Sequence, residues 1–269
     1  MRYLKLVGPY ESYGRPDMWD KDSKIQCVVD ACIWANQEKD PNKQVMLLVE
    51  PRSIQPNVYD YAVRVAHKYK YVFTHDSKLL KELPNAKPLI WSSVWCRYDT
   101  KPEEKTKLIS MVSSNKGMCE LHKERKRIAR KYKDKIDVLG TIDGGSFVDP
   151  IDTLQPYMYS VVIENYIDDI WFTEKILNCF ATKTIPIYYG ARDISKYFNE
   201  KGIIECKNIK ELERFINIVI TQPDNAKGLY NETYMQNAMN ENYELSKKYG
   251  NFEERFYEMY SKEIEGMFE

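Results

Sequence analysis

Histidine and closely spaced cysteine are scarce in this sequence. It has three histidines among its 269 residues and six cysteines, without an HxH, HExxH or CxxC spacing. Zinc sites in proteins draw their ligands from such pairs. The sequence therefore offers no recognisable zinc site, and in a chain of this length we expect the cysteines to be reduced, partly buried thiols.

Net charge and long apolar runs are absent as well. Forty Lys and Arg residues balance 40 Asp and Glu residues, so no overall field attracts nucleic acid or an anionic membrane. No apolar run approaches the roughly 18 residues of a membrane helix, and the N-terminal segment lacks the apolar block of a signal peptide. Since 43% of the chain is hydrophobic and 30% is charged, we expect a folded, soluble protein that is not exported.

Short apolar runs alternate with segments of helical spacing along most of the chain. The apolar runs are residues 44–50, 71–76, 87–95, 107–114, 137–141, 159–165, 184–190 and 202–207. The helix-like segments are residues 25–36, 57–69, 77–83 (opened by Ser77), 119–132, 173–183 and 208–220 (capped by Asn208), followed by a helical, aromatic tail from about residue 230. Strand–helix alternation of this kind favours parallel α/β sheets.

The alternation occurs in two blocks separated by the polar segment 98–106. This favours two Rossmann-like domains that face a cleft, with ligands beyond the carboxyl ends of the strands. We expect the domains at residues 1–100 and 101–245, and a helical tail at residues 246–269 that packs across both.

One polar segment in the second block carries the clearest chemical pattern. A strand delivers Glu164 and Asn165 at its carboxyl end, and a loop leads to Thr173 at the N-cap position of the next helix. Helix N-termini carry partial positive charge and free N–H groups, which suit a diphosphate. Lys175 adds a full positive charge there, whereas Glu174 repels phosphate and suits the hydroxyls of a sugar or ribose. Helix capping alone would also explain Thr173, Glu174 and Lys175, so a capped helix without a ligand and a diphosphate site both stay open at this point.

The stretch ENYIDDIWFTEKILNCFATKTIPIYYGA, residues 164–191, resembles the signature of the α1,3/α1,4-fucosyltransferase family. That signature reads as a Glu-Asn pair, a spacer, Tyr-Val-Thr-Glu-Lys, an apolar helix and Val-Pro-Val-Tyr-Trp-Gly-Ala. A weaker match, SMVSSNKGMCELHKERKRIARKY at residues 110–132, resembles the family's Val-Ser-Asn strand end and Arg-bearing helix. The resemblance implies a GT-B-like fold, with the acceptor domain first and the donor nucleotide sugar bound mainly by the C-terminal half. The resemblance does not extend to residues 1–40.

The resemblance places Asn165, Glu174 and Lys175 around the donor, with Thr173 beside them. The aromatic residue of the family motif falls on Trp171, which is a departure from tyrosine. The phenol hydroxyl is replaced by an indole that can stack or donate one N–H. This departure leaves the identity of the sugar open.

Two further site residues follow from the resemblance. The donor-binding arginine falls on Arg125, whose guanidinium offers a planar fork to phosphate oxygens; Lys123 and Arg127 are rivals because the spacer before them is longer here. The catalytic base falls on Glu50, at a strand end before an aromatic-Asp-Tyr-Ala helix. Independently of the family, partial burial can raise the pKa of such a carboxylate so that it takes a hydroxyl proton. A solvated glutamate, or an ion pair with Arg52, explains Glu50 as well.

The implied activity is that of an inverting glycosyltransferase that moves L-fucose from GDP-fucose onto an acceptor hydroxyl of a glycan. We expect no essential metal, because Arg125, Lys175 and helix amides can stabilise the leaving diphosphate. Asp20-Lys21-Asp22 fits a metal-binding Asp-x-Asp by letters only, since it follows no apolar strand.

Location and alternatives follow from the same comparison. Without a recognisable membrane anchor, the chain resembles cytoplasmic members from bacteria or from viruses in infected host cells. One alternative is transfer from another nucleotide sugar, such as a pentose donor, to a modified DNA base, which the basic segment 123–135 keeps open. The other is a non-catalytic scaffold that binds nucleotide sugars.

Overall fold

The computed structural model describes residues 2–10, 13–96, 98 and 105–269, and it divides into two compact units. The first unit comprises Met1–Trp91, Asp168–Trp171 and Asn251–Glu269, and the second comprises Ser92–Ile167 and Phe172–Gly250. Each unit contains one five-stranded parallel sheet with helices, as the alternation predicts. The crossing segment expected at 98–106 lies mostly outside the described residues. The boundaries expected at residues 100 and 245 stay predictions.

The strands of the first unit follow one another across the sheet in sequence order. They are β1 (Lys5–Val7), β2 (Gln26–Val29), β3 (Gln44–Leu48), β4 (Val72–Thr74) and β5 (Ala86–Pro88). Successive side chains of a strand point to opposite faces. Val29 and Leu47 therefore join one buried apolar cluster, whereas Val28 and Met46 join another. Because both faces of the sheet are covered, side chains on both sides of β3 are buried, and its sequence is an almost continuous apolar run.

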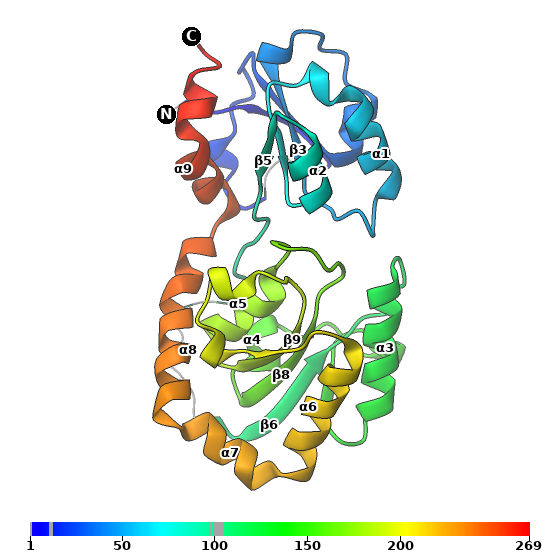
Figure 1. Ribbon diagram of the computed structural model, residues 1–269, viewed down its shortest axis with the longest axis vertical. Helices are drawn as coiled ribbons and strands as arrows, with labels where there is room; N and C mark the ends of the chain where they lie inside the picture. The colour runs from blue at the N-terminus through cyan, green and yellow to red at the C-terminus, as the bar shows by residue number, and fades with distance from the viewer. Residues whose placement is uncertain (1, 11–12, 97, 99–104) are drawn as a thin grey trace. The chain divides into compact units, whose positions relative to one another are not determined.

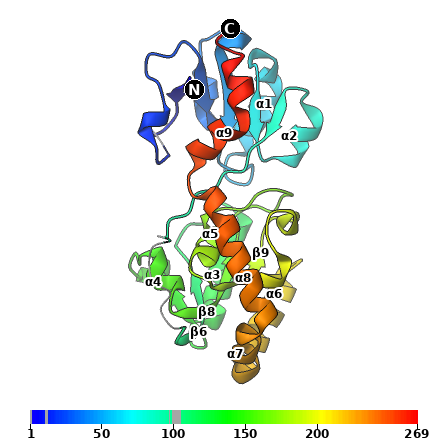
Figure 2. The same cartoon turned by 90° about the vertical axis from the view of Figure 1, so that its left-hand side faces the viewer.

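The strand order decides where the helices of this unit lie. Right-handed crossovers between strands that advance in one direction stay on one face, so α1 (Pro56–Val65) and α2 (Ser77–Glu82) cover the same face. The other face is covered by α9 (Phe252–Glu265), from the far end of the chain, which inserts Phe256 and Tyr257 into the apolar cluster there. Figures 1 and 2 show α9 on the sheet face opposite α1.

The helix expected at residues 25–36 is wrong. The segment forms strand β2 and then a short 3-10 helix, Asp30–Trp34. Periodicity does not separate a short buried strand from a helix, since both faces of such a strand are apolar. The β-branched pair Val28-Val29 favours the strand.

Three smaller differences concern the ends of elements. Strand β1 lies in the N-terminal segment, where no pattern predicts it. Asp76 rather than Ser77 caps α2, because its carboxylate accepts the Leu79 N–H at 2.9 Å. The strand expected at residues 87–95 is shorter, since β5 ends at Pro88, which has no N–H to donate to a ladder.

The sheet of the second unit has the order β10-β9-β8-β6-β7. Its strands are β6 (Lys107–Val112), β7 (Asp137–Leu139), β8 (Tyr157–Ile163), β9 (Ile185–Tyr189) and β10 (Ile204–Glu205), and all pairs are parallel. The chain moves outward from β6 to β7 and then returns past β6 to β8. Strands β6 and β8 therefore form the topological switch point, beside which open α/β sheets bind their ligands.

Helices cover both faces of this second sheet (Figure 1). They are α3 (Glu120–Tyr132), α4 (Pro150–Leu154), α5 (Glu174–Ala181), α6 (Ile209–Thr221), α7 (Pro223–Asn231) and α8 (Thr233–Ser246). Helices α3 and α6 share a face, since Ile128 and Leu212 lie in one apolar cluster, and α4 and α5 contact each other on the other face. The cap expected at Asn208 is confirmed, because its side chain accepts the Glu211 N–H at 3.0 Å.

Short 3-10 helices complete the described secondary structure. They are Pro16–Met18, Asp30–Trp34, Pro41–Lys43, Ala66–Lys68, Ile142–Gly144, Ile194–Lys196, Glu200–Gly202 and Lys247–Tyr249. None of the described helices is both long enough and apolar enough to cross a membrane.

A buried carboxylate joins α9 to the N-terminal segment of the first unit. Glu253, in the first turn of α9, is fully buried. Its Oε1 accepts the backbone N–H groups of Tyr13 and Arg15 at 2.7 and 3.1 Å and the indole N–H of Trp19 at 3.3 Å. The side chain thus ties the two ends of the chain to one another.

We expect Glu253→Ala to lower the free energy of unfolding by about 3 kcal/mol, because the buried indole N–H of Trp19 and two partly buried backbone N–H groups lose their acceptor, and a buried donor left unpaired costs roughly 1–3 kcal/mol. Urea denaturation followed by circular dichroism measures the change. Glu258→Ala, at an exposed position of the same helix, is the control and should stay within about 0.5 kcal/mol of the unmodified protein. A Glu253→Ala variant as stable as this control would contradict the assignment.

Candidate functional site

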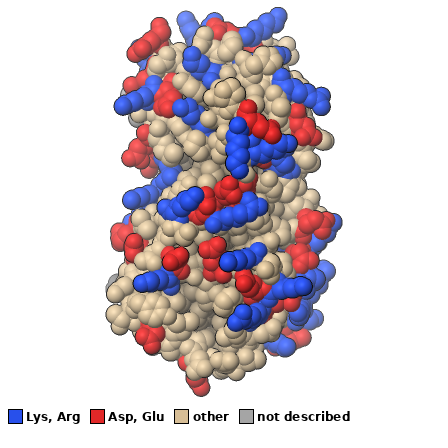
Figure 3. Space-filling view, viewed as in Figure 1, with Lys and Arg blue, Asp and Glu red and all other residues tan. Residues whose placement is uncertain are grey.

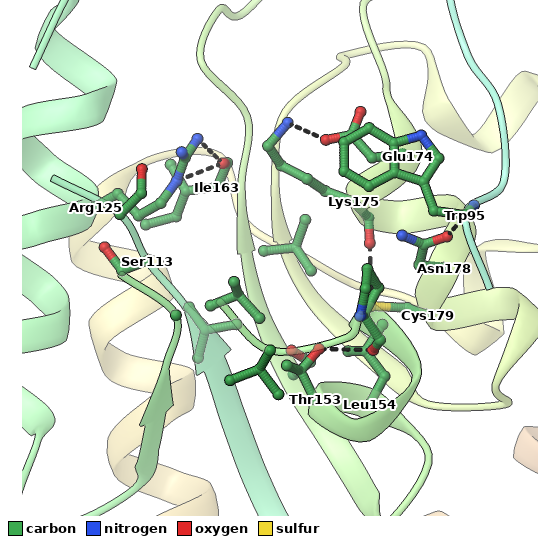
Figure 4. A pocket seen from close by; sticks show the side chains of 18 of the residues that line it. Trp95, Ser113, Arg125, Thr153, Leu154, Ile163, Glu174, Lys175, Asn178 and Cys179 are labelled. Atoms are coloured by element: carbon green, nitrogen blue, oxygen red, sulfur yellow. Dashed lines mark hydrogen bonds and ion pairs between the residues drawn. The ribbon is translucent and has the colours of Figure 1, made fainter. Parts of the chain in front are cut away.

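A cavity of about 360 Å³ opens in the second unit beside the switch point of its sheet. It is lined by the carboxyl end of β6, the carboxyl half of β8 and the first turn of α5, together with side chains from α3 and α4. Figure 4 shows Arg125 and Lys175 on different sides of it. The volume is that of a small-molecule site, and the strand order places ligands at this edge.

Helix α5 begins at the edge of this cavity. Thr173 is its N-cap, as the sequence predicts, because its hydroxyl accepts the Lys175 N–H at 3.4 Å. Glu174 and Lys175, in the first turn, line the cavity, whereas Thr173 is not among the lining residues. The dipole of such a helix start favours a bound anion.

The fully buried carboxylate of Glu164 fixes the geometry of this helix start. Glu164 directly follows β8 and accepts the Thr173 N–H at 3.0 Å and the Thr173 hydroxyl at 2.8 Å. The ammonium of Lys175 lies 3.4 Å from the same carboxylate. Burial raises the pKa of Glu164, and the charge of Lys175 opposes that shift. The loop after β8 and the start of α5 are therefore held by one side chain.

Lys175 and Glu174 form a second ion pair at the cavity wall. Lys175 Nζ donates to Glu174 Oε1 at 3.0 Å and to the Thr173 hydroxyl at 3.0 Å. Burial alone would lower the pKa of Lys175, but the charges of Glu174 and Glu164 outweigh the effect of burial, so the pKa of Lys175 is raised. Burial alone would raise the pKa of Glu174, but the charge of Lys175 outweighs the effect of burial, so the pKa of Glu174 is lowered. The wall thus presents an ammonium beside a carboxylate, which suits a ligand with both phosphate oxygens and hydroxyl groups.

Arg125 enters the cavity from α3. Its Nε donates to the carbonyl oxygen of Ile163, the last residue of β8, at 3.1 Å, and its Nη2 donates to the same oxygen (Figure 4). A guanidinium has five N–H groups, so this anchor leaves donors for a ligand. Lys123 and Arg127 pair with acidic residues of their own surroundings and are not among the lining residues. Of the three candidates on α3, Arg125 is the one that reaches the cavity.

Two buried polar atoms at the cavity, Ser113 Oγ and His122 Nδ1, have no hydrogen-bond partner among the residues that the structure describes. Burial lowers the pKa of His122 to about 4, and the charges of Arg125 and Lys116 act in the same direction. The imidazole is therefore neutral near pH 7. It adds hydrogen-bonding capacity without adding charge.

The cavity brings together four of the expected donor residues. Arg125, Asn165, Glu174 and Lys175 all line it. The backbone carbonyl of Asn165 accepts a hydrogen bond from the Cys119 thiol at 3.3 Å, which ties the end of β8 to the start of α3.

Trp171 and Glu50 belong to the first unit. Trp171 is buried, and its ring centroid lies 4.1 Å from that of His75. Glu50 is exposed and lies two residues after the end of β3. The donor contact expected of Trp171 and the role of base expected of Glu50 stay predictions.

Sequence analysis did not assign Glu164, Ser113, His122 or Trp95 to the site. Glu164 does carry a signal, an acid placed directly after an apolar strand. Trp95 lines the cavity and stays 60% exposed, and its backbone N–H is held at 2.8 Å by Oδ1 of the buried Asn178 (Figure 4). Trp95 shares no local pattern with the motif residues, because only the fold brings this segment to α5.

A glycine lets the end of β9 pass close to Glu164. A Cβ built on Gly190 would lie 2.7 Å from Glu164 Cγ and would collide with the hydroxyl of Tyr188. Tyr188 is fully buried, and its hydroxyl accepts the Ala191 N–H at 2.9 Å. The Tyr-Tyr-Gly-Ala sequence thus packs against the carboxylate that organises α5.

Metal ligands do not gather in the part of the chain that the structure describes. No group of three or more His, Cys, Asp or Glu side chains there is placed to hold a metal ion. Asp20 accepts the Asp22 N–H at 2.9 Å in a turn, which agrees with turn chemistry at this Asp-x-Asp. Metal independence of the activity stays a prediction.

Comparison with known proteins adds to this geometry. Residues 102–253 match the family glycosyltransferase family 10 (fucosyltransferase), C-terminal part, and this is more than half of the chain. The chain belongs to this family. The match runs from β6 to the start of α9 and so includes the elements that line the cavity of this family 10 protein. The resemblance to fucosyltransferases seen in the sequence is confirmed.

One relative of this family 10 protein is the α-(1,3)-fucosyltransferase FucT of Helicobacter pylori, which is 25% identical over 101 residues. That match covers 34% of this chain and 21% of the relative's length. A crystal structure of an α1,3-fucosyltransferase with GDP has a TM-score of 0.55 at 14% identity, covering 93% of this chain and 91% of that one. A crystal structure of TarM has a TM-score of 0.56 at 14% identity, covering 90% and 55%. These likenesses concern the fold, and they confirm the predicted class of two Rossmann-like units, as in GT-B glycosyltransferases.

We expect Gly190→Ala to lower the free energy of unfolding by roughly 1–3 kcal/mol, because an added methyl group in a packed site displaces its neighbours. Thermal unfolding measures the change. Gly228→Ala is a matched control in α7, where a Cβ meets nothing within 4 Å, and it should be neutral or stabilising by up to about 1 kcal/mol. Equal melting temperatures of the two variants would contradict the close approach at Gly190.

Proposed function

We propose that this protein is an inverting glycosyltransferase that transfers L-fucose from GDP-fucose onto an acceptor hydroxyl of a glycan. The observation that carries the proposal is the pair of cations, Arg125 and Lys175, at the switch point of a sheet, beside the carboxylate of Glu174. Family membership supports the choice of fucose. So does the shared fold of a crystal structure of an α1,3-fucosyltransferase with GDP-fucose, with a TM-score of 0.52 at 16% identity, covering 86% of this chain and 82% of that one.

The donor site would work by fixed electrostatics. The diphosphate would lie between Arg125 and Lys175 against the N-terminus of α5, and Glu174 would accept hydrogen bonds from hydroxyl groups of the donor. As the bond to the sugar breaks, negative charge develops on the diphosphate, and cations already in place stabilise it without reorganisation. This arrangement would replace a metal ion.

The acceptor chemistry would fall to Glu50 of the first unit. The acceptor hydroxyl would attack the anomeric carbon while Glu50 takes its proton. The bond between the anomeric carbon and the diphosphate would break on the opposite side, with GDP taking the electron pair. The new glycosidic bond would therefore have the inverted configuration.

Charge pairing argues against DNA as the acceptor. Lys131 and Arg127 on the basic helix α3 pair with Glu213, at 2.8 and 2.9 Å, and Arg130 pairs with Asp143 at 2.6 Å. Figure 3 shows Lys and Arg interspersed with Asp and Glu on the face in view. A nucleic-acid surface needs basic groups that are free to meet phosphates.

Titration calorimetry with GDP-fucose, UDP-, ADP- and CMP-sugars tests the choice of donor. We expect GDP-fucose to bind more tightly than the other three classes. Assays with glycan acceptors then decide between enzyme and scaffold, since a scaffold would bind the donor without turnover. A preference for another nucleotide sugar would overturn the choice of fucose.

We expect Arg125→Ala to weaken GDP-fucose binding by about 10–150-fold, because a charge-assisted hydrogen bond contributes roughly 1.5–3 kcal/mol. Calorimetry measures the dissociation constant. Lys123→Ala, on the same helix but outside the cavity, is the control and should change affinity by less than about twofold. Similar losses in both variants would argue against a specific contact of Arg125 with the diphosphate.

We expect Glu50→Gln to keep the affinity for GDP-fucose and to reduce turnover by roughly 10²-fold or more, since the amide cannot accept the proton. Steady-state kinetics with a glycan acceptor, together with calorimetry of the donor, separates the two effects. A turnover near that of the unmodified protein would remove Glu50 from the mechanism.

A further inference from the structure

The backbone of Glu50 is held from both of its peptide groups. Strand β3 ends at Leu48, so the next N–H groups need new partners. The carboxylate of Asp30, at the end of the neighbouring strand β2, accepts the Val49 N–H at 2.7 Å and the Glu50 N–H at 3.2 Å. The hydroxyl of Tyr59 donates to the Glu50 carbonyl oxygen at 2.8 Å.

Asp30 is built into this position at a conformational cost. It is 5% exposed, and its φ of 46° lies in the left-handed region that few residues other than glycine adopt. Such conformations persist where surrounding contacts enforce them, and they concentrate at functional sites. At Asp30 this conformation accompanies a side-chain carboxylate that accepts N–H groups at the end of β3, where backbone carbonyl groups of a neighbouring strand would otherwise accept them.

Tyr59 is fixed in turn by its neighbours. It is fully buried, and its hydroxyl lies 3.0 Å from His75 Nε2. Because the hydroxyl donates its proton to Glu50, it accepts from Nε2–H, which assigns the tautomer of His75. Arg52 lies over the Tyr59 ring at 4.7 Å and pairs with the buried Asp76 at 2.8 Å.

We propose that Asp30 and Tyr59 are positioning residues, which clamp the backbone of Glu50 so that its exposed carboxylate is held ready for the acceptor hydroxyl. The inference deepens the proposed function and rests on Glu50 as the base. A base must be held in its productive geometry by groups that are themselves fixed. The clamp supplies this, because the side chain of Glu50 projects from a backbone that cannot rotate without breaking two partly buried hydrogen bonds.

Asp30 itself is a rival for the role of base, because burial raises its pKa to about 7, against the opposing N–H groups of Val49 and Glu50. Its accessibility speaks against this role. The carboxylate is almost fully buried and is engaged by two backbone amides. It therefore acts on the chain rather than on a substrate.

The test combines hydrogen exchange with kinetics on Tyr59→Phe, Asp30→Asn and Asp30→Ala. We expect faster amide exchange in residues 49–55 of Tyr59→Phe and Asp30→Ala. We also expect kcat to fall by about tenfold in both variants, with the KM for GDP-fucose within about twofold, because only the base is misplaced. Asp30→Asn should recover most of kcat, since its amide oxygen still accepts an N–H; a loss as large as that of Glu50→Gln would instead make Asp30 the base and overturn the proposal.

Tyr61→Phe is the matched control, on the same helix and packed against the same apolar cluster. It should leave both exchange and kcat unchanged. Faster exchange in Tyr59→Phe with an unchanged kcat would reduce the clamp to a structural role and overturn the proposal, as would unchanged exchange in Asp30→Ala. If the unmodified protein transfers no sugar, the proposed function fails, and the exchange data still show whether Asp30 and Tyr59 hold Glu50.

Discussion

The site of the second unit depends on one buried carboxylate. Glu164 stands at the end of the central strand β8 and holds both the N–H and the hydroxyl of Thr173. It also lies within ion-pair distance of Lys175. This carboxylate ties the start of α5 to the end of β8. Removing one partner of a buried pair costs about 3–5 kcal/mol, so the cation at the cavity wall and the fold of the loop are coupled.

The same device occurs at two places in the first unit. Asp30 accepts backbone N–H groups at the end of β3, and Glu253 accepts those of the N-terminal segment. In each case a buried acid accepts backbone N–H groups of a segment outside the regular strands. Each carboxylate carries a desolvation cost that several N–H donors offset. These buried acids fix the direction of the chain at places where it is not held by a strand or a helix.

The sequence predicts the part of this architecture that is local. Residue spacing predicts the helix caps at Thr173 and Asn208 and the strands β3, β6 and β8. The motif at residues 164–191 predicts that Asn165, Glu174 and Lys175 line the cavity. Strand β2 is misread because a buried strand and a buried helix have similar composition. No local sequence pattern predicts that α9 covers one face of the first sheet. This packing follows from a strand order that places the connecting helices on the other face. Trp95 and Asp30 are missed for the same reason, because their roles arise from contacts between distant segments.

The central claim is that Arg125 and Lys175 hold a nucleoside diphosphate at the switch point between β6 and β8. A crystal structure of the protein with GDP tests it most directly. The account predicts phosphate oxygens in contact with the Arg125 guanidinium, the Lys175 ammonium and the first N–H groups of α5. A nucleotide bound elsewhere, with both side chains away from its phosphates, would contradict the account.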